Sequence, residues 1–203
     1  MKKLFLTSQF RTVGDRLTEI LPKSPKEMTV AFVPTAGDPY GDNKPWLDAD
    51  RQKLVDMGFQ MIELSLKDAT REQVEETLKK ADIVFVAGGN TFYLLHHARL
   101  SGFMDLIPKY VENGLIYVGS SAGSYLACPT IEAGGWRNQD KNIVGLTDLT
   151  ALNLVPFIIF VHYDPKYDEI LAEGKARTKY EVKVLSDNQA LIVEGEKVTQ
   201  IEV

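Results

Sequence analysis

One serine of this chain stands among small residues in a pattern that suits nucleophilic catalysis. Residues 119–123 read Gly-Ser-Ser-Ala-Gly; they follow the apolar run Leu115–Val118 and precede the helix-like segment Ala122–Ala127. A nucleophile elbow needs this strand–turn–helix context, because small neighbours let the backbone turn sharply and expose the central hydroxyl group. The pattern predicts Ser121 as the nucleophile, and the alternative is a tight turn in which small residues simply pack closely.

A second turn of small residues has the same context. Residues 87–91, Ala-Gly-Gly-Asn-Thr, follow the apolar run Ile83–Ala87 and open another helix-like segment. If both turns lie at the carboxyl edge of one parallel sheet, they face a common crevice. The backbone N–H groups of Gly88 or Gly89, together with that of Ala122, would then stabilise an oxyanion. The alternatives are an ordinary glycine-rich turn or a phosphate-binding loop, although the residues match neither G-x-G-x-x-G nor a P-loop.

A serine hydroxyl needs a base, and the chain has three histidines. His96 and His97 are adjacent within a helix-like segment, so at most one of them can face inward. His162 ends the apolar run Leu154–Val161, where the end of a strand would hold a catalytic group on rigid backbone. His162 is therefore the expected general base, and a purely structural histidine is the alternative.

A carboxylate that orients the imidazole would complete a catalytic triad. Sequence spacing does not choose among the acidic residues that follow Ser121. The candidates are Asp140, Asp164, Asp187 and Glu194.

Short apolar runs without alternation follow one another along the chain, separated by helix-length segments. Runs of this kind suit strands that are buried on both faces, and the alternation predicts an α/β fold: a mostly parallel sheet with helices on both faces. The strands are expected at Leu4–Leu6, Val30–Val33, Met61–Leu64, Ile83–Ala87 and Leu115–Val118. The helices between them are expected at Ala49–Met57, Arg71–Ala81, Thr91–Leu100 and Phe103–Val111.

The C-terminal part differs, because its segments are short, closely spaced and partly alternating. Residues 181–187, 190–194 and 197–203 predict a small antiparallel β meander on one edge of the sheet. No linker separates this extension from the rest, so residues 1–203 are expected to form a single α/β domain. The loop from Gly37 to Trp46 is a candidate rim of the crevice.

Composition excludes several classes of function. The 203 residues include 23 Lys and Arg against 28 Asp and Glu, a net charge of −5, which argues against nucleic-acid binding. A single cysteine excludes an internal disulfide framework and a multi-cysteine metal site, and we expect no metal or organic cofactor. No apolar stretch approaches the roughly 20 residues of a membrane span. We therefore expect a cytoplasmic protein without a membrane partner, either a monomer or a homodimer.

Three motifs, in this order, resemble those of peptidase E, the aspartyl dipeptidases of serine peptidase family S51, to which cyanophycinases are similar. They are Ala-Gly-Gly-Asn-Thr-Phe at 87–92, Gly-x-Ser-Ala-Gly-Ser at 119–124 and Ala-Cys-Pro-Thr-Ile at 127–131. Residues 152–156, which lead to His162, resemble the family segment that carries the catalytic histidine. The resemblance implies a class I glutamine-amidotransferase-like fold and a serine-type peptidase.

The family triad is Ser-His-Glu, which by position makes Ser121 the nucleophile and His162 the base. The family glutamate lies in a Pro-Glu-Gly turn before a strand, and here that place reads Ser-Asp-Asn around Asp187. Asp140 matches another family aspartate and is the second choice for the third member.

Two residues are expected to bind substrate: Asn90 of the Gly-Gly-Asn-Thr motif and Arg137. Arg137 lies in the segment 132–140, which looks longer than in typical dipeptidases. Because such segments rim the crevice, specificity for an acidic N-terminal residue does not transfer to this chain. The leading hypothesis is a peptidase acting on short peptides. The alternatives are an esterase or a β-linked-peptide hydrolase with the same site, or a non-catalytic relative that binds a small molecule.

Overall fold

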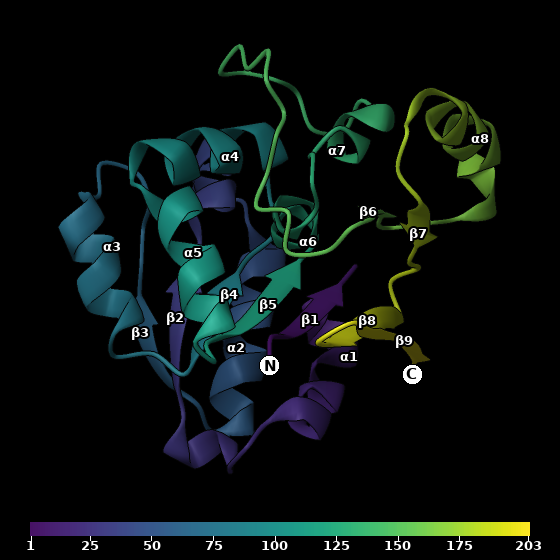
Figure 1. Ribbon diagram of the computed structural model, residues 1–203. Helices are drawn as coiled ribbons and strands as arrows, with labels where there is room; N and C mark the ends of the chain where they lie inside the picture. The colour runs from purple at the N-terminus through teal and green to yellow at the C-terminus, as the bar shows by residue number, and fades with distance from the viewer.

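The computed structural model describes residues 1–203 and contains a seven-stranded sheet with the strand order β3-β2-β4-β5-β1-β8-β9 (Figure 1). The strands β1 to β5 pair with one another in parallel. Their bounds are β1 Lys3–Thr7, β2 Thr29–Val33, β3 Gln60–Glu63, β4 Ile83–Val86 and β5 Ile116–Ser120. The expected α/β fold with a mostly parallel sheet is therefore confirmed.

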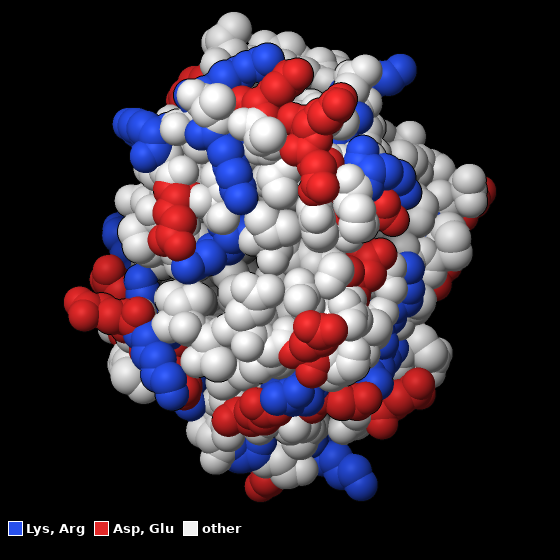
Figure 2. All heavy atoms as spheres, turned by 90° about the vertical axis from the view of Figure 1, so that its right-hand side faces the viewer, with Lys and Arg blue, Asp and Glu red and all other residues white.

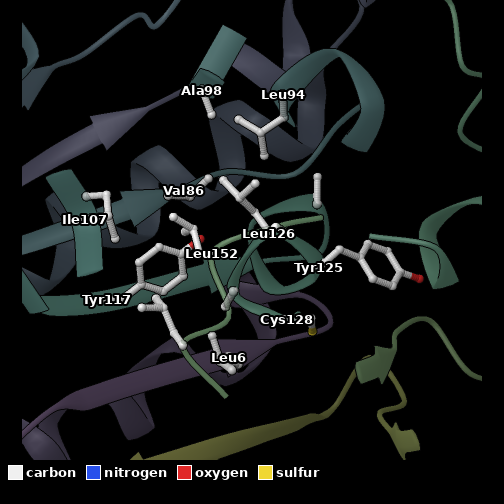
Figure 3. Packing of buried hydrophobic residues seen from close by; sticks show 14 of the residues in the cluster. Leu6, Val86, Leu94, Ala98, Ile107, Tyr117, Tyr125, Leu126, Cys128 and Leu152 are labelled. Carbon is white, nitrogen blue, oxygen red and sulfur yellow. The ribbon is translucent and has the colours of Figure 1, made fainter. Parts of the chain in front are cut away.

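Helices cover both faces of this sheet because side chains of one strand alternate between two hydrophobic clusters. In β4, Val84 and Val86 belong to one cluster and Ile83 and Phe85 to the other. The first cluster includes residues of α3 (Arg71–Leu78), α4 (Thr91–Leu100), α5 (Phe103–Glu112) and α6 (Ala122–Ala127). The second includes residues of α1 (Phe10–Val13) and α2 (Pro45–Met57). Figure 3 shows Leu94, Ala98, Ile107 and Leu126 packed around Val86 and Tyr117.

Local sequence signals set several helix ends. At the start of α3, the side chain of Thr70 accepts a hydrogen bond from the backbone of Gln73, and the Gln73 side chain bonds back to the backbone of Thr70. The helix α2 begins at Pro45, four residues before the expected start, since proline is favoured in the first helical turn. None of the helices is long and apolar enough to cross a bilayer. The remaining helices are α7 Ala133–Trp136, α8 Asp168–Arg177 and the short 3-10 helices Gly14–Ile20, Pro25–Glu27, Thr35–Tyr40 and Pro165–Tyr167.

The C-terminal segments divide between two sheets. The strands β8 (Gln189–Glu194) and β9 (Lys197–Glu202) form an antiparallel hairpin that pairs with β1 at the edge of the main sheet, as expected. The prediction is wrong for the first segment, because β7 (Val182–Val184) pairs in parallel with β6 (Ile158–Phe160) in a separate two-stranded sheet. The buried strand β6 needs a partner for its backbone groups, and β8 already occupies the edge of β1.

The register of the central strands brings three turns to one edge of the sheet. Thr7 at the end of β1 lies opposite Ser120, and Val86 at the end of β4 lies opposite Gly119. The residues that follow β1, β4 and β5 therefore meet at the carboxyl edge, where α/β proteins hold their ligands.

The surface mixes charges of both signs. Figure 2 shows acidic and basic side chains interspersed over the face that is on the right in Figure 1, where α8 and the C-terminal strands lie. This face has no extended basic patch of the kind that phosphate backbones require.

Candidate active site

Ser121 lies at a strained turn between β5 and α6. Its backbone has φ 51° and ψ −105°, a conformation that an L-residue holds only when its surroundings enforce it. The Ser121 N–H donates to the carbonyl of Thr7 at 3.0 Å. The flanking glycines allow close backbone contacts: a Cβ on Gly119 would lie 2.7 Å from the Gly123 carbonyl, and a Cβ on Gly123 would lie 2.0 Å from the Val86 oxygen. The spacing of small residues that singled out Ser121 therefore has a steric cause.

His162 reaches this serine from outside the main sheet. It lies two residues after the short buried strand β6 and, like Ser121, has a positive φ, 56°. Its Nε2 lies 2.9 Å from Ser121 Oγ, within hydrogen-bonding distance. The His162 backbone N–H donates to Ser8 Oγ at 2.8 Å, which holds the start of the loop after β6 against the end of β1.

Asp187 is the carboxylate that meets the imidazole. Its Oδ1 lies 2.5 Å from His162 Nδ1 and also accepts a hydrogen bond from Ser8 Oγ at 2.7 Å. The hydrogen bond with His162 lowers the pKa of Asp187 to about 2, since it stabilises the charged carboxylate more than burial disfavours it. Ser121, His162 and Asp187 thus form one continuous hydrogen-bonded chain.

The other candidate carboxylates make different contacts. Asp140 Oδ2 accepts hydrogen bonds from the backbone N–H of Thr91, at 3.0 Å, and from the Thr91 hydroxyl, and it makes none with His162. Burial raises the pKa of Asp140. Asp164 accepts from the Lys166 backbone, and Glu194 lies 3.9 Å from the Lys3 ammonium. The second choice for the third member, Asp140, is therefore wrong as a partner of the imidazole.

The glycine turn after β4 lies against the serine turn. A Cβ on Gly88 would lie 3.2 Å from Ser121 Cβ, and Gly89 has φ +145° with the Ala36 carbonyl in the place of a side chain. The N–H groups of Gly88, Gly89 and Ala122 make no backbone hydrogen bond. Free N–H donors beside the hydroxyl are what an oxyanion hole needs.

The expectation that Asn90 binds substrate is wrong. Asn90 Oδ1 accepts a hydrogen bond from the Tyr93 N–H at 2.9 Å and caps α4, and Nδ2 donates to the Lys141 carbonyl at 2.9 Å. The residue is 4% exposed and lies outside the lining of the cavity. The side-chain oxygen of Asn90 is used to cap the helix. Its amide nitrogen holds the loop that carries Asp140 through the Lys141 carbonyl, instead of contacting a ligand.

A cavity of about 250 Å³ opens beside Ser121 and is lined mostly by polar side chains. Arg137 lines it, as expected for a substrate-binding residue, and Tyr40 and Trp46 of the predicted rim loop line it too. Trp46 Nε1 donates to the Gly88 carbonyl at 3.3 Å, which ties that loop to the glycine turn.

Several residues of the site were not found from the sequence. Ser8 directly follows β1, and the rule that polar residues at strand ends gather at one edge could have found it. Asp50 is 2% exposed on α2, accepts a hydrogen bond from the Arg11 N–H at 2.9 Å, and lines the cavity. Burial raises the pKa of Asp50 to about 6. No sequence signal marks Asp50 or Tyr125, because their side chains depend on how two elements pack.

Side chains of His, Cys, Asp and Glu do not gather in groups of three anywhere in residues 1–203, as a metal site built from them would require. The groups that the chain itself supplies at the cavity include a hydroxyl group, an imidazole, carboxylates and backbone N–H donors.

Comparisons with known proteins agree on one family. The model of peptidase family S51 matches residues 4–201. An uncharacterized peptidase of Listeria monocytogenes is 32% identical over 203 residues, which cover 98% of this chain and 97% of that protein. Peptidase E of Nostoc sp. is 32% identical over 170 residues, 80% of this chain and 66% of the relative. A crystal structure of a candidate peptidase E protein from Listeria monocytogenes EGD-e superposes with a TM-score of 0.88 at 30% identity, covering 100% of this chain and 99% of that one.

Proposed function

This chain belongs to peptidase family S51, as its motifs predicted, and we propose that it hydrolyses short peptides with Ser121, His162 and Asp187 as a catalytic triad. Membership of this family, together with relatives that are named peptidase E, supports a serine-type peptidase. The observation that carries the triad is the continuous contact from Ser121 Oγ through both imidazole nitrogens to Asp187 Oδ1, at 2.9 Å and 2.5 Å.

The geometry supports a two-step acyl transfer. Ser121 Oγ attacks the scissile carbonyl carbon while His162 Nε2 takes the hydroxyl proton. Asp187 holds the imidazole by Nδ1 and stabilises the imidazolium that forms. The N–H groups of Gly89 and Ala122 receive the developing oxyanion. His162 then gives its proton to the leaving amine as the C–N bond breaks, and water, deprotonated by the same imidazole, releases the acyl group from Ser121.

The size of the cavity supports a short substrate. Its volume of about 250 Å³ lies below the roughly 300–1,000 Å³ of ordinary ligand pockets, so it holds one or two residues and not an extended peptide. Gly88, Gly89 and Ser121 of the two turns line it, as do Trp46 and Tyr40.

The test is Ser121→Ala with dipeptides as substrates. We expect a loss of at least about 10³-fold in kcat/KM, because the nucleophile is removed while the cavity keeps its shape. A fluorophosphonate probe should label Ser121 in the parent chain. The matched control is Ser101→Ala, which removes another buried serine that does not line the cavity and should keep both hydrolysis and labelling. Full activity of Ser121→Ala would refute the assignment.

The same assays separate the remaining alternatives. Faster hydrolysis of simple acyl esters or of β-linked dipeptides than of α-dipeptides would move the function to an esterase or a β-linked-peptide hydrolase. A chain that takes no fluorophosphonate label and cleaves none of these substrates would be a binding protein on the same fold.

A further inference from the structure

One carboxylate of the cavity lies where the packing favours an apolar side chain. The buried residues of α2 are Leu47, Asp50 and Leu54, and the two leucines belong to the hydrophobic cluster on that face of the sheet. Asp50 lies between them, is 2% exposed, and lines the cavity beside Ser121. Burying a carboxylate costs free energy that a leucine at the same position would not cost. A carboxylate that is kept in the wall of a candidate active site against this cost points to a role in the chemistry.

The hydrogen-bond donors at Asp50 are neutral groups. The Arg11 backbone N–H donates to Asp50 Oδ1 at 2.9 Å, and the Ser120 hydroxyl group is the other hydrogen-bonding neighbour of the carboxylate. Ser120 directly precedes Ser121 and accepts a hydrogen bond from the Phe10 N–H at 3.3 Å. These neutral donors hold the carboxylate in place without cancelling its charge.

Two cationic groups lie close enough for their charges to act on Asp50. They are the Arg11 guanidinium, on α1, and the His162 ring when it is protonated, on the loop after β6. Arg11 is exposed, so water screens much of its charge. His162 is the base of the proposed triad and becomes positive when it takes the proton of Ser121. Because the interaction is mutual, an ionised Asp50 stabilises that imidazolium and lowers the barrier to the proton transfer.

The other carboxylate in the cavity lining, Asp140, has a charge that is more fully balanced. The Arg137 guanidinium acts on Asp140 more strongly than His162 does. Arg137 is half-buried, unlike Arg11, so water screens this pair less. Of the two carboxylates in the lining, Asp50 is therefore the one whose charge remains more available to His162.

We propose that Asp50 acts through His162 as a second carboxylate, besides Asp187, whose charge stabilises the imidazolium. Asp187 contacts the ring at Nδ1 and sets its orientation. Asp50 makes no hydrogen bond with the ring and is a positioning residue that acts by its charge from α2. This inference rests on the proposed function, since the imidazolium forms when Ser121 attacks.

The first test is Asp50→Asn, measured at pH 8 by the rate at which a neutral fluorophosphonate labels Ser121 and by kcat for a dipeptide. Asparagine keeps an acceptor for the Arg11 N–H and removes only the charge. We expect both rates to fall about tenfold with little change in KM, as one partly screened charge in the site would produce. The same variant should be more stable than the parent in urea at pH 8, so misfolding would not explain the lost rate. Asp48→Asn removes an exposed acid of α2 that does not line the cavity, and it should change neither rate.

The pH dependence separates the charge of Asp50 from a structural effect of the substitution. Burial raises the pKa of Asp50 to about 6, so its carboxyl group is mostly protonated at pH 5 and ionised at pH 8. The ratio of the parent labelling rate to that of Asp50→Asn should therefore rise from about 1 at pH 5 to about 10 at pH 8. Arg11 stays charged over this range and His162 is common to both chains, so neither changes the ratio. A ratio that is constant from pH 5 to pH 8 would overturn the proposal.

The neutral probe also distinguishes this role from substrate binding. A buried carboxylate in a cavity is also able to bind a cationic group of a substrate. If Asp50→Asn raises KM only for substrates that carry an ammonium group and leaves labelling by the neutral probe unchanged, Asp50 binds that group and the proposal is wrong.

An NMR titration keeps the inference separate from the proposed function, because it needs no nucleophile. In the Ser121→Ala chain, the His162 ring should take up its proton at a pH about half a unit to one unit lower once Asp50→Asn is added. Adding Asp48→Asn instead should leave the titration in place. An unchanged titration with Asp50→Asn would refute the charge interaction even where labelling supports the triad. The expected shift in a chain whose parent takes no fluorophosphonate label would refute the triad alone.

Discussion

The two halves of the candidate triad are held in different ways. Ser121 lies within the main sheet and helix packing, and every residue of α6 behind it is buried. His162 and Asp187 lie outside the main sheet, on the loops that follow β6 and β7, and their side chains are 25% and 50% exposed. Backbone sterics therefore hold Ser121, whereas hydrogen bonds that involve side chains hold His162 and Asp187.

Ser8 connects these two regions. It follows β1, the strand beside β5, and its hydroxyl group contacts both the His162 backbone N–H and Asp187 Oδ1. The two halves of the site should therefore respond differently to substitution. Changes near Ser121 should mainly cost folding stability, and changes near Asp187 should mainly cost activity.

The largest effect is expected from Asp187→Asn. The amide is unable to stabilise the imidazolium or enforce its tautomer, and loss of the carboxylate in Ser-His-Asp triads lowers kcat by about 10⁴. The lowered pKa of Asp187 shows that its carboxylate also stabilises the folded chain, so a modest loss in the free energy of unfolding should accompany the loss of activity. Asp164→Asn, an exposed aspartate two residues from His162, is the control and should retain activity. If Asp140→Asn lowers kcat more than Asp187→Asn does, the assignment of the acid is wrong.

Gly123→Ala should destabilise the half of the site that contains Ser121. Its Cβ would lie 2.0 Å from the Val86 oxygen, so α6 and the end of β4 must move apart, at a cost of about 3 kcal/mol or more in the free energy of unfolding. Urea titration of the folded chain measures this loss. Gly145→Ala shows the cost of backbone strain without a clash, since Gly145 has a positive φ, +67°, and open space around it, whereas Gly123 has the clash and no positive φ. A cost of about 1–2 kcal/mol is expected there, and equal losses for both variants would contradict the steric argument.

Asp50→Asn should change how stability depends on pH. The folded-state pKa of about 6 lies above the ordinary value of 3.8, so the folded chain retains a proton that the unfolded chain has lost between about pH 4 and pH 6. Unfolding free energy therefore falls as pH rises through that window, by up to about 3 kcal/mol. The asparagine does not titrate and keeps an acceptor for the Arg11 N–H, so its urea stability should exceed that of the parent at pH 8. A parent stability that rises from pH 4 to pH 6 while that of Asp50→Asn does not would contradict the buried carboxylate.

The smallest effect is expected from Ser8→Ala, which removes the link between the two halves. The variant leaves the triad atoms in place but withdraws one hydrogen bond from the charged Asp187 and one acceptor from the His162 backbone. We expect kcat to fall about tenfold, with the parent substrate preference retained. Ser186→Ala removes a hydroxyl group that contacts Asn188 and serves as control. An unchanged kcat in Ser8→Ala would show that the base and acid hold their places without the sheet.

Much of this protein follows from local sequence. The sheet order was not predicted, but β1 to β5, the helix over 91–100 and the turn at Ser121 were, because apolar runs, helix caps and small-residue turns act over a few neighbouring positions. The family motifs lie at those same turns, where glycine is required because the backbone of a neighbouring turn, helix or strand end occupies the place of a side chain.

The partners of the reactive groups depend on contacts that no local pattern records. Ser8 and His162 are 154 positions apart, and the acid that meets the imidazole comes from a loop after a strand that pairs differently from the expected one. Asn90 was expected to bind substrate, but its side chain caps a helix. Asp50 and Tyr125 line the cavity because their helices pack against the sheet. The sequence alone determined the elements and the sharp turn at Ser121, since both are set by short-range sterics and burial. Only the tertiary structure decided which carboxylate, which serine and which tyrosine share the site, because those neighbours are chosen by the packing of distant segments.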